Sequence, residues 1–206
     1  MDSATWPWLQ EVSIIRVPRF FKILLVLVLA ALGIFGYTKL MSRIGSGTPP
    51  AISQPDQQAD HILVSKQDKM MYLLRDGKVL RSYQIAMGTN WADGHKEREG
   101  DERTPEGSYS IDWRNAKSVA HLSLHISYPD ENDRKRADEG GIDPGGNIMI
   151  HGLPNGWGAL GSLHRIFDWT DGCIAVTNQE MQEIWALTPT NTPITIAAHM
   201  APEGEE

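Results

Sequence analysis

Residues 168–175 read Asp-Trp-Thr-Asp-Gly-Cys-Ile-Ala and contain Cys173, the only cysteine of the 206-residue chain. The pair His151-Gly152 lies 22 residues before it. A cysteine reacts as its thiolate, so a working thiol needs a base or a cation nearby, and His151 is the leading candidate. Gly172 has no Cβ, which lets a substrate carbonyl approach the backbone N–H groups of Gly172 and Cys173 as an oxyanion hole. The alternative is a small buried hydrophobe beside an unrelated core histidine.

An apolar run of 18 residues, from Phe20 to Tyr37, lies near the start of the chain. As a helix it spans about 27 Å, close to the hydrocarbon thickness of a bilayer. Three basic residues stand before or within its start and two follow it, which favours a cytoplasmic N-terminus. We therefore predict a cytoplasmic segment over residues 1–19 and a single-pass signal anchor over residues 20–40 in the inner (cytoplasmic) membrane. The remaining chain is then periplasmic or extracytoplasmic.

Two other interpretations of this run are a cleavable signal peptide and a buried core helix. The residues that follow it, 37–41, read Tyr-Thr-Lys-Leu-Met and lack the Ala-x-Ala-like pattern of a cleavage site. A core helix fits less well, because the run has no polar face to meet water. The anchor and the signal peptide both place the rest of the chain outside the cytoplasm.

Composition divides the rest of the chain. Residues 41–60 are rich in Gly, Ser, Pro, Gln and Asp and indicate a flexible linker, residues 61–198 are long enough for one domain, and residues 199–206 form an acidic tail. Residues 1–43 hold five basic and two acidic residues, a net charge of +3. The rest of the chain must then carry a net charge of −10 to give the overall −7. Such an acidic domain is a poor candidate for binding nucleic acid or an anionic bilayer surface.

Alternating apolar and polar residues predict a mostly β domain. The predicted strands cover residues 62–64, 70–74, 78–87, 107–113, 147–150 and 192–197. Asp76-Gly77 favours a two-residue hairpin turn, and the fifth strand ends directly at His151, which would hold the imidazole in position. Thr177 and Glu180 have capping-box spacing and predict one short supporting helix after the cysteine. This pattern favours a β-sandwich or barrel-like sheet over a parallel α/β fold.

Two charged stretches are predicted as loops. Residues 88–103 are dense in charge and glycine and indicate a mobile surface loop, and residues 130–136 indicate a solvated loop. A Ca²⁺ site in the second stretch is disfavoured, because basic residues directly follow the acidic ones. His121 and His125 have the spacing of helical metal ligands, but as strand residues they lie about 13 Å apart, so we predict no metal site.

Taken together, these residues resemble the L,D-transpeptidase (YkuD-type) family of bacterial cell-wall enzymes over residues 61–197. Besides the opening hairpin, the resemblance rests on four segments: Gly100-Asp101-Glu102-Arg103-Thr104-Pro105-Glu106-Gly107-Ser108-Tyr109, Ile126-Ser127-Tyr128-Pro129, Ile150-His151-Gly152 and Thr170-Asp171-Gly172-Cys173-Ile174. Each segment is a weak signal alone. Their order and spacing together are a strong one.

The resemblance implies an L,D-transpeptidase-type fold, no cofactor, and action on peptidoglycan stem peptides. By that analogy Cys173 attacks the carbonyl of the third stem residue, D-Ala leaves, and an amine acceptor (a second stem or a wall-linked protein) resolves the thioester. His151 is then the general base and acid, and Gly172 and Cys173 supply oxyanion N–H groups. With water as acceptor the protein is an L,D-endopeptidase or carboxypeptidase, and a non-catalytic wall-binding module is the remaining alternative.

One position departs from the family pattern. Ala175 stands where many members carry arginine or asparagine after the nucleophile, so a positive group for a substrate carboxylate is missing there. His164 and Arg165 can supply it, and we predict Arg165 as the carboxylate clamp. The structural alternative is an ion pair from Arg165 to Asp168 or Asp171 that holds the loop. Two neighbours of the catalytic pair complete the candidate substrate-binding residues: Gly152 and Thr170.

Overall fold

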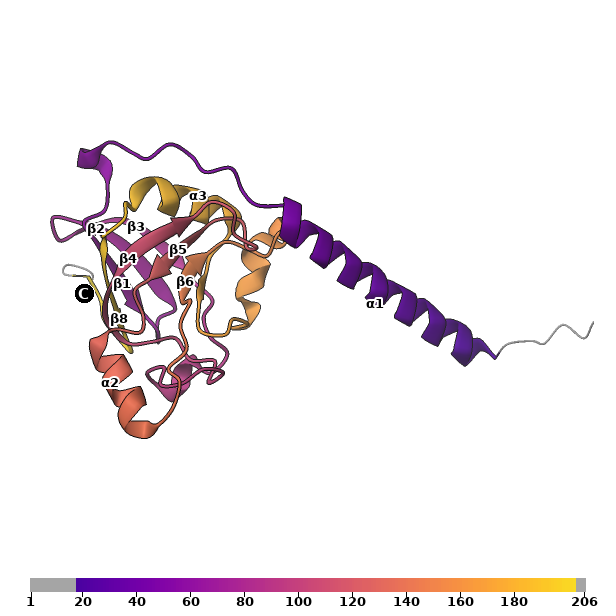
Figure 1. Ribbon diagram of the computed structural model, residues 1–206. Helices are drawn as coiled ribbons and strands as arrows, with labels where there is room; N and C mark the ends of the chain where they lie inside the picture. The colour runs from indigo at the N-terminus through magenta and orange to yellow at the C-terminus, as the bar shows by residue number, and fades with distance from the viewer. Residues whose placement is uncertain (1–17, 203–206) are drawn as a thin grey trace, which may run out of the picture. The chain divides into compact units, whose positions relative to one another are not determined.

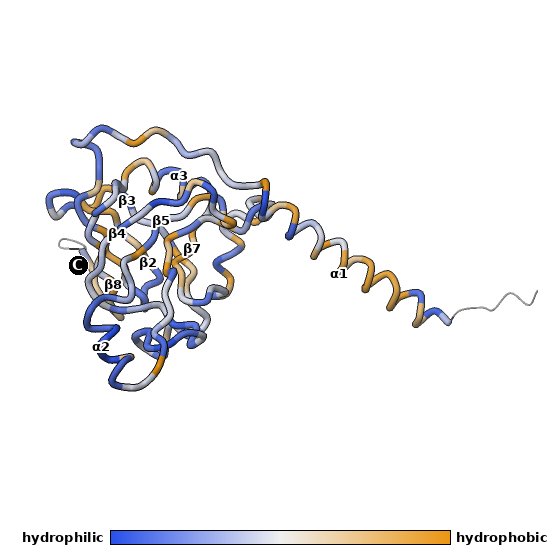
Figure 2. Tube along the Cα trace, viewed as in Figure 1, coloured by the Kyte–Doolittle hydropathy of each residue, from blue (hydrophilic) through white to orange (hydrophobic). Residues whose placement is uncertain are grey.

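The computed structural model describes residues 18–202, so most of the predicted cytoplasmic segment (1–19) and half of the predicted acidic tail (199–206) lie outside the described residues. The described residues fall into two compact units, which divide between Tyr37 and Thr38. Helix α1 (Arg19–Ile44) has no buried residue and is mostly apolar, as Figure 2 shows. Within the described part of the chain it is the one helix that is long and apolar enough to cross a membrane.

Eight strands form one curled sheet (Figure 1). Their order is β3-β2-β1-β8-β4-β5-β6-β7, and only the β1–β8 and β6–β7 pairs are parallel. The strands are β1 (His61–Ser65), β2 (Met70–Arg75), β3 (Lys78–Gln84), β4 (Gly107–Asn115), β5 (Ser123–Ile126), β6 (Met149–His151), β7 (Ile174–Ala175) and β8 (Pro193–Ala197). The prediction of a mostly β domain is confirmed.

The two ends of this strand order meet, which gives the sheet its barrel-like curl. Just beyond β3, Ala86 exchanges two backbone hydrogen bonds with Ala175 of β7, at 3.0 and 2.7 Å. Next to them, Thr170 N–H donates to the carbonyl of Met87 (3.1 Å), and Thr89 N–H donates to the carbonyl of Thr170 (3.0 Å). The segment that leads to Cys173 is therefore bonded to both edges of the sheet.

The alternation read from the sequence is what fills the core. On β1 and β8, Ile62, Val64, Ile194 and Ile196 are buried and pack with the apolar residues of β5, β6 and β7. The Asp76-Gly77 turn joins β2 to β3 as predicted, with both residues at positive φ (50° and 74°), the conformation that a two-residue hairpin turn of this kind requires.

Helix α3 (Asn178–Leu187) begins as the sequence predicts. The Thr177 side chain accepts from Glu180 N–H and the Glu180 carboxylate accepts from Thr177 N–H, which completes the capping box. The helix buries Met181, Ile184 and Trp185 against the sheet. Residues 18–202 also contain three 3₁₀ helices: η1 (Pro55–Gln57), η2 (Trp91–Asp93) and η3 (Gly158–Ile166).

The prediction of a solvated loop over residues 130–136 is wrong, because this stretch opens helix α2 (Glu131–Gly140). Asp130 caps the helix by accepting from Asp133 N–H at 2.8 Å, and Asp133 accepts from Asp130 N–H at 3.0 Å. The helix is almost wholly polar (Figure 2), so it has no apolar periodicity to detect.

The stretch predicted as a mobile surface loop (residues 88–103), together with residues 104–106, is folded around buried charges. Lys66 is buried, and its ammonium group donates to the carbonyls of Gly94 (2.7 Å) and Thr104 (3.0 Å) and to the Glu106 carboxylate (2.7 Å). A second buried ion pair joins Lys96 to Asp101 at 2.8 Å. Asp101 also accepts three backbone N–H bonds, from residues 97, 98 and 103. Residues 97–100 of the loop are exposed, as predicted for a surface loop, but part of the charge in this stretch forms internal ion pairs.

The segment predicted as a flexible linker (41–60) also differs from expectation. Its first residues continue α1 to Ile44, and the rest runs along the domain (Figure 1). Hydrogen bonds attach it along its length, among them Ser46 Oγ to Ser118 O (2.8 Å), Gly47 N to His121 O (2.8 Å), Ser53 N to Ala186 O (2.9 Å) and Ala59 N to Leu187 O (2.9 Å).

Candidate active site

Cys173 and His151 lie at the ends of two neighbouring parallel strands, β7 and β6. His151 ends β6, Cys173 directly precedes β7, and the register pairs Ile150 with Ile174 and His151 with Ala175. Because side chains alternate along a strand, Cys173, Ala175 and His151 share one face while Ile150 and Ile174 point into the core. An offset of two residues and the strand spacing place the two Cα atoms about 8 Å apart, so the thiol and the imidazole can meet.

Hydrogen bonding fixes the tautomer of His151. Its Nδ1 lies 2.6 Å from the carbonyl oxygen of Gly152. Since a carbonyl only accepts, Nδ1 carries the proton and Nε2 of the neutral ring is the acceptor. Burial lowers the pKa of His151, and the bond to Gly152 acts in the opposite direction with a smaller effect. The resting imidazole is therefore neutral, and the ring of Trp169 packs edge-on against it with centroids 5.7 Å apart.

Gly152, predicted as a substrate contact, contributes through this carbonyl. A Cβ at Gly152 would lie 2.8 Å from both Asn178 Oδ1 and His121 Cβ, so glycine is required by close packing. Asn178 Oδ1 also accepts from Leu153 N–H at 2.8 Å. Asn178 begins α3, so this helix supports the turn that orients His151. The sequence contains no local signal for that contact.

Cys173 is partly exposed, and its Sγ lies 3.6 Å from the carbonyl oxygen of Asn147. Burial raises the pKa of the Cys173 thiol and Asp171 adds to the rise, whereas a backbone bond from Met149 and the charge of Lys96 lower it. The net shift is upward. The resting pair is thus a neutral thiol and a neutral imidazole, and the base has to take the proton as the sulfur attacks.

Gly172 is required by the backbone packed against it. Its φ is +118°, and a Cβ there would lie 2.5 Å from the carbonyl oxygen of Arg103. Across the same contact, a Cβ at Gly88 would lie 2.2 Å from Glu102 O and 2.9 Å from Gly172 Cα. Three backbone segments therefore meet behind the cysteine. The sequence suggested that the absence of a Cβ at Gly172 makes room for a substrate carbonyl. In the structure that space is taken by the carbonyl of Arg103.

Thr170 holds the turn that ends in Cys173. Its hydroxyl donates to the Cys173 carbonyl at 2.7 Å and accepts from Gly172 N–H at 3.3 Å. Thr170 is buried, so the structure places this predicted substrate contact inside the turn. Of the two predicted oxyanion donors, Gly172 N–H is thus partly engaged, which makes Cys173 N–H the stronger candidate.

His164 and Arg165 lie on η3, and each is partly engaged: Trp169 Nε1 donates to His164 Nδ1 at 3.4 Å, while His164 Nε2 and Arg165 Nε are buried without a partner. The Arg165 guanidinium pairs with Glu180, so the predicted alternative of an ion pair to Asp168 or Asp171 is wrong. His164 is buried; burial, and next the charge of Arg165, lower the pKa of His164 to about 4. A carboxylate clamp at Arg165 stays a prediction, and it would need Arg165 to exchange Glu180 for the substrate.

Asp168 has a structural role that the sequence did not reveal. Its carboxylate accepts from Lys69 Nζ (2.7 Å), Trp91 Nε1 (2.7 Å) and Met87 N–H (3.0 Å). Lys69 lies in the turn between β1 and β2, and Met87 and Trp91 follow β3, so all three donors are distant from Asp168 in the chain. Asp168 therefore ties the start of the cysteine segment to the opposite edge of the curled sheet.

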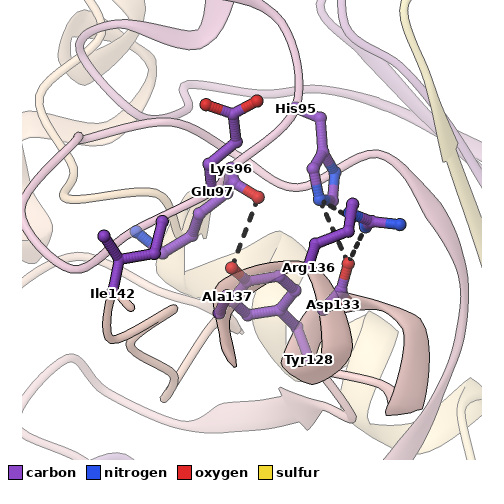
Figure 3. A pocket seen from close by; sticks show the side chains of 8 residues that line it. All are labelled: His95, Lys96, Glu97, Tyr128, Asp133, Arg136, Ala137 and Ile142. Atoms are coloured by element: carbon purple, nitrogen blue, oxygen red, sulfur yellow. Dashed lines mark hydrogen bonds and ion pairs between the residues drawn. The ribbon is translucent and has the colours of Figure 1, made fainter. Parts of the chain in front are cut away.

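Two polar cavities lie near the loop over residues 88–106. The first, about 250 Å³, lies between that loop and α2 (Figure 3). In it the Tyr128 hydroxyl donates to the Lys96 carbonyl at 3.3 Å. The Asp133 carboxylate contacts His95 Nε2 at 3.1 Å and forms an ion pair with Arg136. This network joins α2 to the loop that supports Gly172.

The second cavity, about 410 Å³, adjoins the cysteine, since Asn147 and Asp171 are among the residues that line it. Lys96 also lines it, together with the carboxylates of Glu99 and Glu102. Within residues 18–202, no group of three or more His, Cys, Asp or Glu side chains is arranged to hold a metal ion.

A single curled sheet with a few short helices fits the fold of an L,D-transpeptidase catalytic domain. Residues 59–196 match the YkuD family model, described as the L,D-transpeptidase catalytic domain, and the chain belongs to this family.

Individual relatives agree with this assignment. The chain is 27% identical over 174 residues to "Putative L,D-transpeptidase YafK" of Escherichia coli K12, a match that covers 80% of this chain and 62% of YafK. The chain thus spans less than two thirds of the length of that relative. Among solved structures it is similar to the helical cell shape determining protein Pgp2 from Campylobacter jejuni, with a TM-score of 0.52 and 22% identity over 80% of this chain and 56% of Pgp2. At that identity the likeness shows the fold.

Proposed function

We propose that this protein is a membrane-anchored L,D-transpeptidase that acts on peptidoglycan stem peptides through a thioester on Cys173. Family membership supports the class of reaction. The observation that carries the mechanism is the bond from His151 Nδ1 to Gly152 O, which leaves Nε2 as a base on the strand face shared with Cys173.

In the proposed acylation, His151 Nε2 takes the Sγ proton as the sulfur attacks the carbonyl carbon of the third stem residue. The carbonyl oxygen becomes an oxyanion that accepts from Cys173 N–H. When this intermediate collapses, the C–N bond to D-Ala breaks and the imidazolium gives its proton to the leaving amine. A thioester and neutral His151 remain.

In the second step an amine attacks the thioester carbon, its proton passes to His151, and the thiolate leaves and regains that proton. The cavity beside Cys173 supports an amine as acceptor. Its lining includes the carboxylates of Glu99, Glu102 and Asp171, which attract an incoming ammonium group and disfavour an anionic acceptor. Hydrolysis follows the same path with water in place of the amine.

The proposal includes α1 as an uncleaved anchor in the inner membrane, with the catalytic domain on the periplasmic side. The length and apolar composition of α1 support it. New or altered links between stems change the mesh of the wall, so we also assign the protein to cell-wall organisation and cell shape. Pgp2 is described in the same terms, as a helical cell shape determining protein.

Product analysis tests this function. The full chain in detergent is incubated with a disaccharide-tetrapeptide, and the products are resolved by mass. We expect release of D-Ala and formation of a cross-linked dimer, with neither from folded Cys173→Ala. If D-Ala is released and the tripeptide is the only other product, the protein is a hydrolase and not a transpeptidase. A wild-type chain that binds the substrate and releases no D-Ala would leave only the wall-binding alternative.

A further inference from the structure

The 3₁₀ helix η3 presents its large apolar residues to the outside, whereas its two basic side chains, His164 and Arg165, turn toward the protein. We call the exposed set the η3 apolar face: Leu160, Leu163, Ile166 and Phe167, which are 43%, 62%, 72% and 66% exposed. In a 3₁₀ helix side chains three residues apart lie on one side, which aligns Leu163 with Ile166. Between them His164 is only 6% exposed and Arg165 pairs with Glu180. Water favours the reverse arrangement, so this face fits an apolar surrounding.

The η3 apolar face adjoins a groove of about 560 Å³. Besides that face, its wall is formed mainly by apolar and aromatic side chains: Leu153, Pro154, Trp157 and Trp169. Trp169 packs on His151, so the groove lies on the side of the domain that carries the catalytic histidine. A polar sugar or peptide is a poor occupant of such a surface.

Charge distinguishes this region from the rest of the domain. Residues 153–167 contain no aspartate or glutamate, and Arg165 is their one formally charged side chain. The chain after residue 43 carries −10, which repels anionic lipid headgroups. No acidic side chain belongs to the η3 apolar face, and the Glu180 carboxylate that contacts this stretch is paired with Arg165. This face can therefore approach an anionic bilayer with less like-charge repulsion than the rest of the domain.

The chain itself holds this region near a bilayer. From Lys39, at the end of the apolar run, to Gly45 is about 9 Å of helix, close to the thickness of a headgroup layer. At Gly45 the chain already packs on Asn155, where an added Cβ would lie 2.9 Å from the Asn155 Cβ. The next two residues bond to Ser118 and His121 at 2.8 Å each. Asn155 belongs to the same acid-free stretch as η3.

Resting on the proposed anchoring of α1, we propose that the η3 apolar face inserts into the periplasmic leaflet of the bilayer that α1 spans. The occupant is the boundary between headgroups and acyl chains, where apolar side chains on a short helix bury themselves without crossing the membrane. Two contacts, the anchor and η3, then fix the orientation of the domain. The active site is held close to the membrane, and the enzyme acts on the wall layer nearest to it.

The test uses the full chain in nanodiscs of phosphatidylethanolamine and phosphatidylglycerol. In a Cys173→Ala background, Leu163→Cys or Ile166→Cys is labelled with an environment-sensitive fluorophore. Lys78→Cys is the matched control, since Lys78 is exposed at the start of β3, a strand that contributes no residue to the groove beside η3. We expect the η3 labels to shift to the blue, to be quenched by acyl-chain nitroxide lipids and to be shielded from iodide, and the Lys78 label to show none of these.

A second variant probes the energetics. Moving one large apolar side chain from water to hydrocarbon shifts an equilibrium roughly tenfold. Leu163→Gln with Phe167→Gln should therefore restore iodide access to a label at residue 166, whereas Val79→Gln on β3 should not. Equal iodide access at residues 166 and 78 in the parent chain would overturn the proposal.

Two further results would overturn the docking. Shielding without nitroxide quenching, together with energy transfer between labelled copies, would make a second copy the occupant. Failure of the chain to copurify with the discs would remove the anchor and the docking together. None of these outcomes touches the chemistry proposed at Cys173, which is measured separately on the wild-type chain.

Discussion

Gly172→Ala is the substitution that tests most sharply how the fold positions Cys173, the proposed nucleophile. The backbone of Gly172 has φ of +118°, and an added Cβ would lie 2.5 Å from Arg103 O and 3.2 Å from Ile148 Cδ1. The first neighbour is backbone in a loop tied down by the buried Lys96–Asp101 pair, so it cannot move aside easily. The variant therefore has to shift the turn that carries Cys173.

The size of the effect follows from two terms. A non-glycine residue in such a conformation costs about 1–3 kcal/mol. Relieving the contact with Arg103 O needs a displacement of roughly 0.5–1 Å, and errors of that size at a catalytic group cost up to about 100-fold in rate. We expect Gly172→Ala to lower the free energy of unfolding by about 2–4 kcal/mol and kcat/KM by about 10- to 100-fold.

Two control variants separate these terms. Gly77→Ala has positive φ (+74°) with nothing within 4 Å of the added Cβ, so it reports backbone strain alone and should cost about 1 kcal/mol with full activity. Gly88→Ala meets Glu102 O at 2.2 Å without a positive φ, so it reports the contact alone. Urea unfolding and D-Ala release are measured for all three variants. If Gly172→Ala is as mild as Gly77→Ala in both assays, the account of the turn is wrong.

Three further predictions concern charge. Burial by itself raises the pKa of Asp101, but the bonds from Lys96 and three backbone N–H groups outweigh it and hold this pKa at about 2. The ionised Asp101 carboxylate therefore stabilises the fold at pH values above the usual carboxyl pKa, and this stabilisation is lost as the pH falls from about 4 to 2. The free energy of unfolding should fall by about 2 kcal/mol over that range, and Asp101→Asn should abolish this pH dependence in urea unfolding. Equal pH slopes in both proteins would contradict this. Because burial lowers the pKa of His151, kcat/KM should stay constant from about pH 7.5 down to about 6.5 and fall only at lower pH. A fall in kcat/KM centred above about pH 7 would be inconsistent with a neutral resting imidazole. If Arg165 clamps a substrate carboxylate, Arg165→Ala should lose roughly 10- to 150-fold in kcat/KM on stems with a free carboxylate and much less on amidated stems, while equal losses on both would assign Arg165 only to its ion pair with Glu180.

Much of the fold is predictable because its signals are local. Period-two alternation marks the strands, Asp76-Gly77 marks the hairpin, and Thr177 with Glu180 marks the start of α3. The elements that escaped prediction lack such signals. β7 has only two residues, and α2 is a polar helix whose cap pairs two aspartates in place of the usual hydroxyl and glutamate.

The site divides in the same way. Cys173 and His151 stand out by residue type, and the strand that ends at His151 is visible in the sequence. The groups that position them come from distant parts of the chain: the Arg103 carbonyl against Gly172, Asn178 beneath the His151 turn, and Lys66 inside the loop. Buried ion pairs look like surface charge in a sequence, because charge alone does not report burial.

The most direct test of the account is the mass of Cys173 during turnover. The full chain is mixed with a disaccharide-tetrapeptide whose acceptor amine is blocked, quenched in acid and digested. We predict a peptide containing Cys173 that is heavier by the stem minus D-Ala, that loses this mass in hydroxylamine, and that is absent from folded Cys173→Ala. Release of D-Ala by that variant at the wild-type rate would contradict the account.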